Sequence, residues 1–295
     1  MKKILGSFLA PILVLGAFSM TTSVHAAKPD LHVDQQIELD ISPADVWSIV
    51  SDFGRLQDWH PVVVADEITH GTNNVPGAIR RLTFVDGGTL DERLTAYEPQ
   101  NRLLRYTITA GAFPVSDYLT TIEVKALPDP RRALFTWSGT FSRADGSARP
   151  APGKDDAAAV AAVTGVYSTG LQALKKIVAD TNAIREVIGW YADGGTAGDS
   201  ARVGRAFHPS ATMKFIRNGQ LVDEPIANYL SGYIKAGVVS PRTVKIDHID
   251  IEGTAASAKL TIDYPTHQFI DYFNLLKIEG RWLVVSKTFH RKEKS

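Results

Sequence analysis

Short runs of alternating apolar and polar residues dominate the first half of the chain. They cover residues 33–39, 62–69, 78–84, 89–97, 102–109, 117–126 and 133–141, and a period of two is typical of strands with one buried face. A short helix is predicted after the first strand, because Ser42-Pro43-Ala44-Asp45 combines an N-cap, a proline at the first helical position and a carboxylate. A loop-rich segment, 143–156, precedes a long helical pattern over residues 157–179. This order predicts an antiparallel sheet packed on a long terminal helix.

Helical periodicity also opens the second half, where Ile184, Val187, Ile188 and Tyr191 follow the i, i+3, i+4, i+7 pattern of a separate helix. Two shorter helices are predicted, one ending near residue 206 and one over residues 226–233, with an Asn-Gly hairpin turn at 218–219 between them. Four strands then span residues 243–252, 255–263, 267–279 and 281–289, with a bulge expected near His248 because the alternation slips there. Three helices before a four-strand meander predict a second α+β unit.

The amino terminus has the pattern of a secretory signal peptide. Lys2 and Lys3 precede an almost wholly apolar run over residues 4–20, and Val24-His25-Ala26 places small residues where a signal peptidase reads them. We therefore expect cleavage after Ala26, a periplasmic or secreted mature protein, and no stable membrane anchor after cleavage. The expected organisation is a signal peptide over 1–26, a first domain over 27–180 and a second domain over 181–295.

Composition excludes several classes of protein. The 295 residues are 44% hydrophobic and 22% charged, which is ordinary for globular domains. Because 32 basic residues balance 32 acidic ones, nucleic acid is not an expected partner. The chain has no cysteine, its histidines lack metal-ligand spacing, and it has no phosphate-binding glycine loop. No metal and no cofactor is expected.

Three segments of the first half, SPADVWSIVSDFGRLQDWHP, DERLTAYEPQNRLLRYTI and VSDYLTTIEV, resemble the START-like (SRPBCC) superfamily of polyketide cyclases and lipid-transfer proteins. The resemblance covers residues 31–180 and implies a helix-grip fold, in which a curved sheet wraps the terminal helix and encloses a cavity. This half is also similar to the plant abscisic-acid receptors, which implies that loops 85–89 and 111–115 close over a ligand.

The second half resembles the lumazine-binding group of the nuclear transport factor 2-like (NTF2-like) cone fold. The resemblance covers residues 182–291 and rests on AFHPSATM, IRNGQL and DYFNLLKIEGRWLVVSKTFH. The expected fold class is therefore α+β, a helix-grip domain followed by an α+β cone, both with curved antiparallel sheets.

Strand alternation and the first resemblance together predict ligand-binding residues in the first domain. These are aromatic or apolar side chains, one carboxylate and one histidine: Tyr106, Ile108, Tyr118, Trp137, Glu92 and His60. Gly165 and Gly170 of the terminal helix would leave room for the ligand. The alternatives are that the aromatic side chains simply fill the core, that Glu92 pairs on a solvated face, and that His60 bonds to backbone.

In the second domain, Tyr191 is a further candidate ligand-binding residue. Cone-fold enzymes use aspartate or histidine in an apolar cavity, which implies Asp263, His267 and His208 as weak catalytic candidates. None has a recognised catalytic spacing, and His208 has the alternative role of holding its own turn.

Three functions remain open. The first is binding of a small, mostly apolar or aromatic molecule in the START-like cavity, with a second cavity in the NTF2-like domain. The second is cyclase, isomerase or dehydratase chemistry on a polyketide-like or ring substrate, and the third is an accessory role for a periplasmic enzyme. The last two strands carry apolar residues on both alternating faces, so the second face needs a cover. A homodimer through the NTF2-like sheet is expected, and the alternative is cover by the START-like domain of the same chain.

Overall fold

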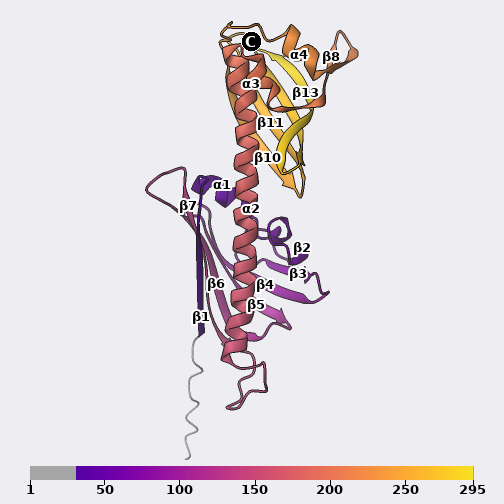
Figure 1. Ribbon diagram of the computed structural model, residues 1–295. Helices are drawn as coiled ribbons and strands as arrows, with labels where there is room; N and C mark the ends of the chain where they lie inside the picture. The colour runs from indigo at the N-terminus through magenta and orange to yellow at the C-terminus, as the bar shows by residue number, and fades with distance from the viewer. Residues whose placement is uncertain (1–30, 295) are drawn as a thin grey trace, which may run out of the picture.

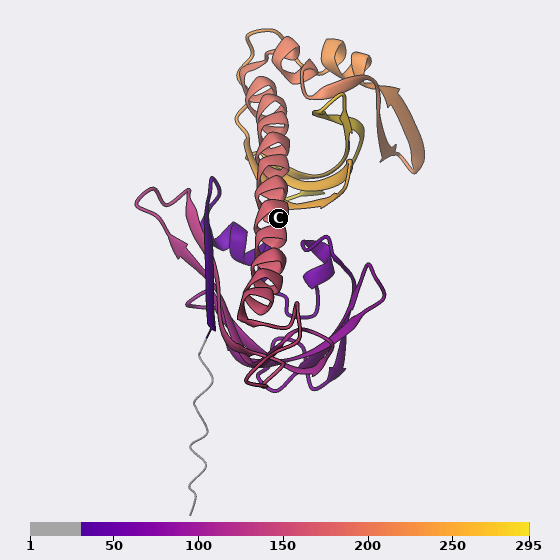
Figure 2. The same ribbon diagram turned by 60° about the horizontal axis from the view of Figure 1, so that its bottom comes forward.

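The computed structural model describes residues 31–294, so the predicted leader over residues 1–26 lies outside the described residues. Two curved sheets share one long helix, which runs through the molecule as a common spine (Figure 1). The first sheet wraps the amino-terminal half of that helix, and the second sheet lies beside its carboxy-terminal half (Figure 2). The protein is therefore an α+β chain with two sheets on a single helix.

The first sheet has seven antiparallel strands in the order β1-β7-β6-β5-β4-β3-β2. Their bounds are β1 (Leu31–Leu39), β2 (Val63–His70), β3 (Ile79–Phe84), β4 (Thr89–Glu98), β5 (Leu103–Gly111), β6 (Val115–Ala126) and β7 (Ala133–Arg143). Helix α1 (Pro43–Val50) begins where predicted, with the Ser42 hydroxyl accepting a hydrogen bond from the Asp45 amide. A short 3-10 helix, η1 (Leu56–Asp58), then leads into β2.

Helix α2 spans Asp156–Ala197 without a break, so the prediction of two separate helices is wrong. The physical reason is that neither proline nor glycine interrupts residues 179–184, and the buried stripe continues through Val178, Thr181 and Ile184. Gly198 ends the helix in the left-handed conformation, with φ of 70°. By length and composition alone α2 could cross a membrane, but here it packs against both sheets.

The second sheet has six strands in the order β10-β11-β12-β13-β8-β9, antiparallel except for the β13–β8 pair. Their bounds are β8 (Phe207–Arg217), β9 (Gln220–Pro225), β10 (Thr243–Glu252), β11 (Ala255–Asp263), β12 (His267–Ile278) and β13 (Arg281–Glu293), with helices α3 (Ser200–Gly204) and α4 (Ile226–Gly232). The predicted bulge is confirmed, because the β10–β11 register shifts between Ile246 and His248.

Polar contacts attach the middle of α2 to both domains. The Asp180 carboxylate accepts hydrogen bonds from Lys277 Nζ at 2.5 Å and from Trp282 Nε1 at 2.9 Å, both of the second domain. Slightly further along, Asn182 donates to the Asp40 carbonyl and Arg185 pairs with Asp45, both of the first domain. The helix is thus held on two sides at the point where the domains meet.

Candidate functional site

The structure places the six residues predicted in the first domain along one cavity between the sheet and α2. This cavity measures about 30 Å³, which is room for about two water molecules. Sites for small molecules usually measure about 300 to 1,000 Å³. The cavity in this conformation is therefore too small for the predicted ligand, and ligand binding by these residues stays a prediction.

Aromatic side chains occupy the space. Trp137 stacks on Tyr167 with ring centroids 4.5 Å apart, and its Nε1 donates to the Tyr106 hydroxyl at 3.1 Å. The Tyr118 and Tyr167 hydroxyls are 2.8 Å apart. A Cβ at Gly170 would lie 2.7 Å from Trp137, so the space left by this glycine holds a tryptophan rather than a ligand.

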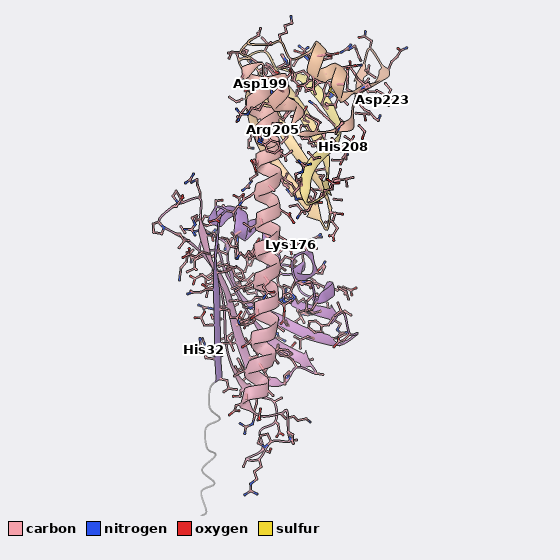
Figure 3. All side chains as sticks on the ribbon, in the orientation of Figure 1. His32, Lys176, Asp199, Arg205, His208 and Asp223 are labelled. Carbon is pink, nitrogen blue, oxygen red and sulfur yellow. The ribbon has the colours of Figure 1, made fainter. Side chains whose placement is uncertain are left out.

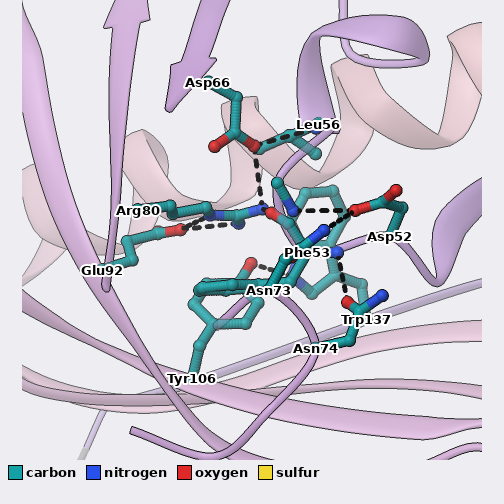
Figure 4. Close-up of polar contacts among 11 residues, drawn as sticks. Asp52, Phe53, Leu56, Asp66, Asn73, Asn74, Arg80, Glu92, Tyr106 and Trp137 are labelled. Carbon is teal, nitrogen blue, oxygen red and sulfur yellow. Dashed lines mark hydrogen bonds and ion pairs between the residues drawn. The ribbon is translucent and has the colours of Figure 1, made fainter. Parts of the chain in front are cut away.

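A buried charge cluster borders the same cavity (Figure 4). Arg80 donates to Glu92 Oε2 from Nη2 at 2.6 Å and from Nε at 2.8 Å, and to the Phe53 carbonyl at 2.6 Å. Its Nη1 lies 3.4 Å from Asp66 Oδ2. Burial raises the pKa of both Glu92 and Asp66, against the lowering effect of Arg80. Glu92 therefore points inward, and the alternative of pairing on a solvated face does not hold.

His60 is buried, with Nε2 3.0 Å from the Val166 carbonyl oxygen and with Nδ1 unpartnered among the described residues. Burial lowers the pKa of His60, since the charged imidazolium would lose its hydration. The ring is therefore neutral and bonds to backbone through Nε2, which was the alternative to ligand binding. Its Nδ1 is left as an acceptor beside the small cavity.

The second domain contains a much larger cavity of about 740 Å³. Its walls come from the end of α2, from β8, from α4, from the segment 233–242 and from β11, β12 and β13. Aromatic side chains line it throughout, namely Tyr191, Phe215, Tyr229, Tyr233, Tyr264, Phe269 and Phe289. This volume lies within the range of small-molecule sites.

Three side chains form a hydrogen-bonded triad at the buried end of this cavity. Lys287 Nζ lies 2.6 Å from Asp271 Oδ2 and donates to the Tyr191 hydroxyl at 2.8 Å. Tyr191 in turn donates to Asp271 Oδ2 at 2.9 Å, while Asp271 Oδ1 is buried with no partner among the described residues. Burial, followed by the neighbouring Asp271 charge, raises the pKa of Tyr191 well above its usual range, so its hydroxyl stays protonated.

Arg242 lies beside the triad, with its Cζ 5.4 Å from the centre of the Tyr191 ring. Its guanidinium contacts the Tyr191 and Ala192 carbonyls at 3.2 and 3.3 Å, the Tyr264 hydroxyl at 3.3 Å and Thr196 Oγ1 at 3.4 Å. Within residues 31–294 it forms no ion pair, so it is a cation without a carboxylate partner at the cavity wall.

The other residues predicted in the second domain lie apart from this cavity, except Tyr191. Asp263 accepts from Gln268 and pairs with Lys294, and His267 stacks on Tyr264 with centroids 4.7 Å apart. His208, which Figure 3 labels on the second domain, has Nδ1 2.7 Å from the Ser210 hydroxyl, the turn-holding contact considered as its alternative role. None of the three lines the 740 Å³ cavity, and their catalytic role stays an untested prediction.

Sequence reasoning identified Glu92 but missed the other charged residues of both sites, although a signal existed for some. In the alternation of β12, Asp271 falls on the same face as the buried Phe273 and Leu275. In β3, Arg80 falls on the same face as the buried Leu82. Lys287 could not be found in this way, because the β13 register skips a residue between Val284 and Ser286. This bulge reverses the faces and turns Lys287 inward.

No group of three His, Asp or Glu side chains that could hold a metal ion occurs within residues 31–294.

The chain matches two family models in series. Residues 30–179 match the family described as "Polyketide cyclase / dehydrase and lipid transport", and residues 179–290 match the family described as "Putative lumazine-binding". Because the first match covers half of the chain, it establishes membership of that family.

Individual proteins are similar to one half of the chain or the other. MLP-like protein 423 of Arabidopsis thaliana is 27% identical over 126 residues, which is 38% of this chain and 76% of that protein. The solved structure of XoxI from Bacillus cereus is 34% identical, with a TM-score of 0.45, and covers 51% of this chain and 97% of its own. An NTF2-like protein of unknown function from Shewanella baltica is 36% identical, with a TM-score of 0.37, and covers 40% of this chain and 97% of its own.

The helix-grip sheet around the first half of α2 and the cone beside its second half agree with the two family models. The chain therefore belongs to the polyketide cyclase/dehydrase and lipid transport family, and carries a lumazine-binding-type, NTF2-like domain after it.

Proposed function

We propose that this protein binds a small, mostly apolar or aromatic molecule, and that the cavity of the second domain holds it. The observation that carries the proposal is the contrast in volume: about 740 Å³ in the second domain against about 30 Å³ in the first. Aromatic walls with a few polar groups at one end are typical of sites that orient a largely apolar ligand.

A thermal-shift screen of the full chain with aromatic acids, polyketides, sterols and fatty acids tests the proposal. A ligand at 100 times its dissociation constant stabilises the folded state by about 2.7 kcal/mol. Phe289→Ala, in the second cavity, should weaken binding of a hit by about tenfold, since the ligand loses about 1.4 kcal/mol of contact. The matched variant Phe113→Ala removes a ring from the first cavity and should leave binding unchanged. If Phe113→Ala weakens binding and Phe289→Ala does not, the ligand binds in the START-like cavity instead.

Acid–base catalysis on a ring substrate is a second candidate function, and the triad is the observation that favours it. Within residues 31–294 one oxygen of Asp271 has no partner, and the other accepts a hydrogen bond from Tyr191, which lines the cavity. Aryl ketones incubated with the protein in heavy water should then exchange the protons next to their carbonyl group, as followed by NMR. Exchange that is lost in Asp271→Asn, in a variant that still binds the ketone, supports catalysis. Binding without any exchange in the unchanged protein supports a binding function alone.

Export is part of the proposal and rests on the amino-terminal sequence pattern. We expect cell fractionation to place the protein in the periplasm or medium, and N-terminal sequencing to begin at Ala27. Recovery of Met1 from a cytoplasmic protein would refute it. An accessory role for a periplasmic enzyme stays a prediction, to be tested by whether such an enzyme loses activity when this protein is deleted.

A further inference from the structure

We infer that the cavity of the second domain selects an organic anion, whose acidic group lies against Arg242 and Lys287 beside Tyr191. This inference rests on the proposed function and names the chemical class of the ligand.

The charges around the cavity are of one sign. Five cationic side chains line it, namely Arg217, Lys235, Arg242, Lys287 and Arg291, whereas no Asp or Glu of the described residues does. Asp271 neutralises Lys287 from behind the wall, and Glu293 pairs with Arg291 at 2.8 Å. The cavity therefore presents a net positive potential to whatever enters it.

Arg242 is the cation best placed to receive an anion. It is partly buried at the wall, and its uncompensated charge has lost part of its hydration. All four contacts of its guanidinium measure 3.2 to 3.4 Å, which is long for an N–H···O bond. The group is thus loosely held by neutral partners, and a carboxylate would provide a shorter, charge-assisted bond.

Lys287 contributes a second donor at the same place. Its ammonium group has three protons and uses two of them on Asp271 and Tyr191. Lys287 Nζ lies 5.0 Å from the centre of the Tyr191 ring, and Arg242 Cζ lies 5.4 Å from that centre. Both cations therefore lie close to the same buried tyrosine ring.

The remaining walls determine the body of the ligand. Beyond the two cations the cavity is lined by the rings of Tyr229, Phe269 and Phe289, which favour a flat or aromatic body by offset or edge contacts. An aromatic carboxylate combines both features, whereas a neutral molecule of the same shape leaves Arg242 without a counter-charge.

Two probes of the same shape test the inference: 2-naphthoate, which is an anion, and 2-naphthamide, which is neutral. Isothermal titration of the full chain at low salt should show naphthoate binding at least tenfold more tightly than the amide. Added salt should reduce this ratio because it screens the attraction. Equal affinities of the two probes would overturn the inference and leave the proposed binding function intact.

Variants locate the acidic group. Arg242→Gln should reduce naphthoate binding to the level of the amide. Gly195→Ala provides an independent test that keeps the charge, because a Cβ there would lie 1.7 Å from Arg242 Nη2 and push the guanidinium aside. Gly189→Ala is the matched control on the same helix, since a Cβ there meets nothing within 4 Å.

The outcomes distinguish failure of the anion inference from failure of the proposed binding function. Loss of the naphthoate preference in both Arg242→Gln and Gly195→Ala, but not in Gly189→Ala, supports the site. A preference that persists in both variants would show that the anion binds elsewhere and would overturn it. If neither probe binds while neutral molecules of the screen do, the anion inference fails alone. If no molecule of either charge binds, the proposed function fails as well.

Discussion

Asp271 and Lys287 form an ion pair that is shielded from water, with relative exposures of 0% and 4%. Removing one partner of such a pair leaves a buried charge without compensation, which typically costs about 3–5 kcal/mol. We expect Lys287→Met to lower the free energy of unfolding by this amount, as measured by urea denaturation. The double variant Asp271→Leu/Lys287→Met should recover most of the loss, because it leaves no unpaired charge. A double variant that is less stable than either single variant would contradict this account of the pair.

His60 should give the first domain a specific dependence on pH. Because burial lowers its pKa below the usual 6.5, its stabilising contribution is present above pH 6.5 and is lost as the pH falls through its folded-state pKa. The loss therefore falls in the range below pH 6.5. We expect His60→Gln to lose less stability than the unchanged protein over this range, and the exposed His290→Gln to follow the unchanged protein. Parallel curves for all three proteins would show that His60 does not titrate in this way.

At the scale of elements, the continuity of α2 makes Asp180 a structural residue rather than part of a linker. Burial alone would raise the pKa of Asp180, but the hydrogen bonds from Lys277 and Trp282 outweigh it and keep the pKa below its usual 3.8. The carboxylate therefore stabilises the fold above about pH 4 and loses this effect as the pH falls through its folded-state pKa.

We expect Asp180→Ala to lower the free energy of unfolding by about 2 kcal/mol at pH 7, since two charge-assisted hydrogen bonds are lost. The difference from the unchanged protein should shrink at pH 3. Asp193→Ala is the matched control on the same helix, because Asp193 pairs with the exposed Arg202 and should cost less than about 1 kcal/mol. Equal effects of the two variants in chemical denaturation would rule out a special role for Asp180.

At the scale of the whole molecule, the outer face of the second sheet is the surface through which we expect a homodimer. Tyr272 and Leu276 are 48% and 41% exposed on the same face of β12, and soluble monomers rarely expose large apolar patches. Light scattering of the full chain should give the mass of a dimer, and Tyr272→Asp/Leu276→Asp should give that of a monomer. Leu119→Asp changes a residue that is 46% exposed in the first domain and should not alter the mass. A monomeric unchanged protein would refute the dimer.

Light scattering should be done on the full chain rather than on the second domain alone. A fragment that starts at residue 181 would cut α2 in its interior and remove Asp180, the acceptor for Lys277 and Trp282. Aggregation of such a fragment would therefore report on the broken helix as well as on the exposed face.

Much of the architecture follows from local patterns in the sequence. Period-two alternation places the strands of the first sheet and strands β10 to β13 of the second, the Ser42 cap starts α1, and the slip at His248 marks a bulge that the structure contains. Parity along the strands also identifies Glu92, Tyr106 and Trp137 as inward-facing residues of the first domain. These features are local because they depend on neighbours within a few residues, which the sequence displays directly.

Only the tertiary structure decided which cavity has room for a ligand and which charges meet inside it. The same aromatic residues that predict a cavity wall in the first domain fill that space, because Trp137 and Tyr167 stack across it from different elements. In the second domain, the bulge at Val285 turns Lys287 inward, and the segment before β10 brings Arg242 to the end of α2. Packing between distant segments sets these volumes and pairings, and no pattern of neighbouring residues encodes them.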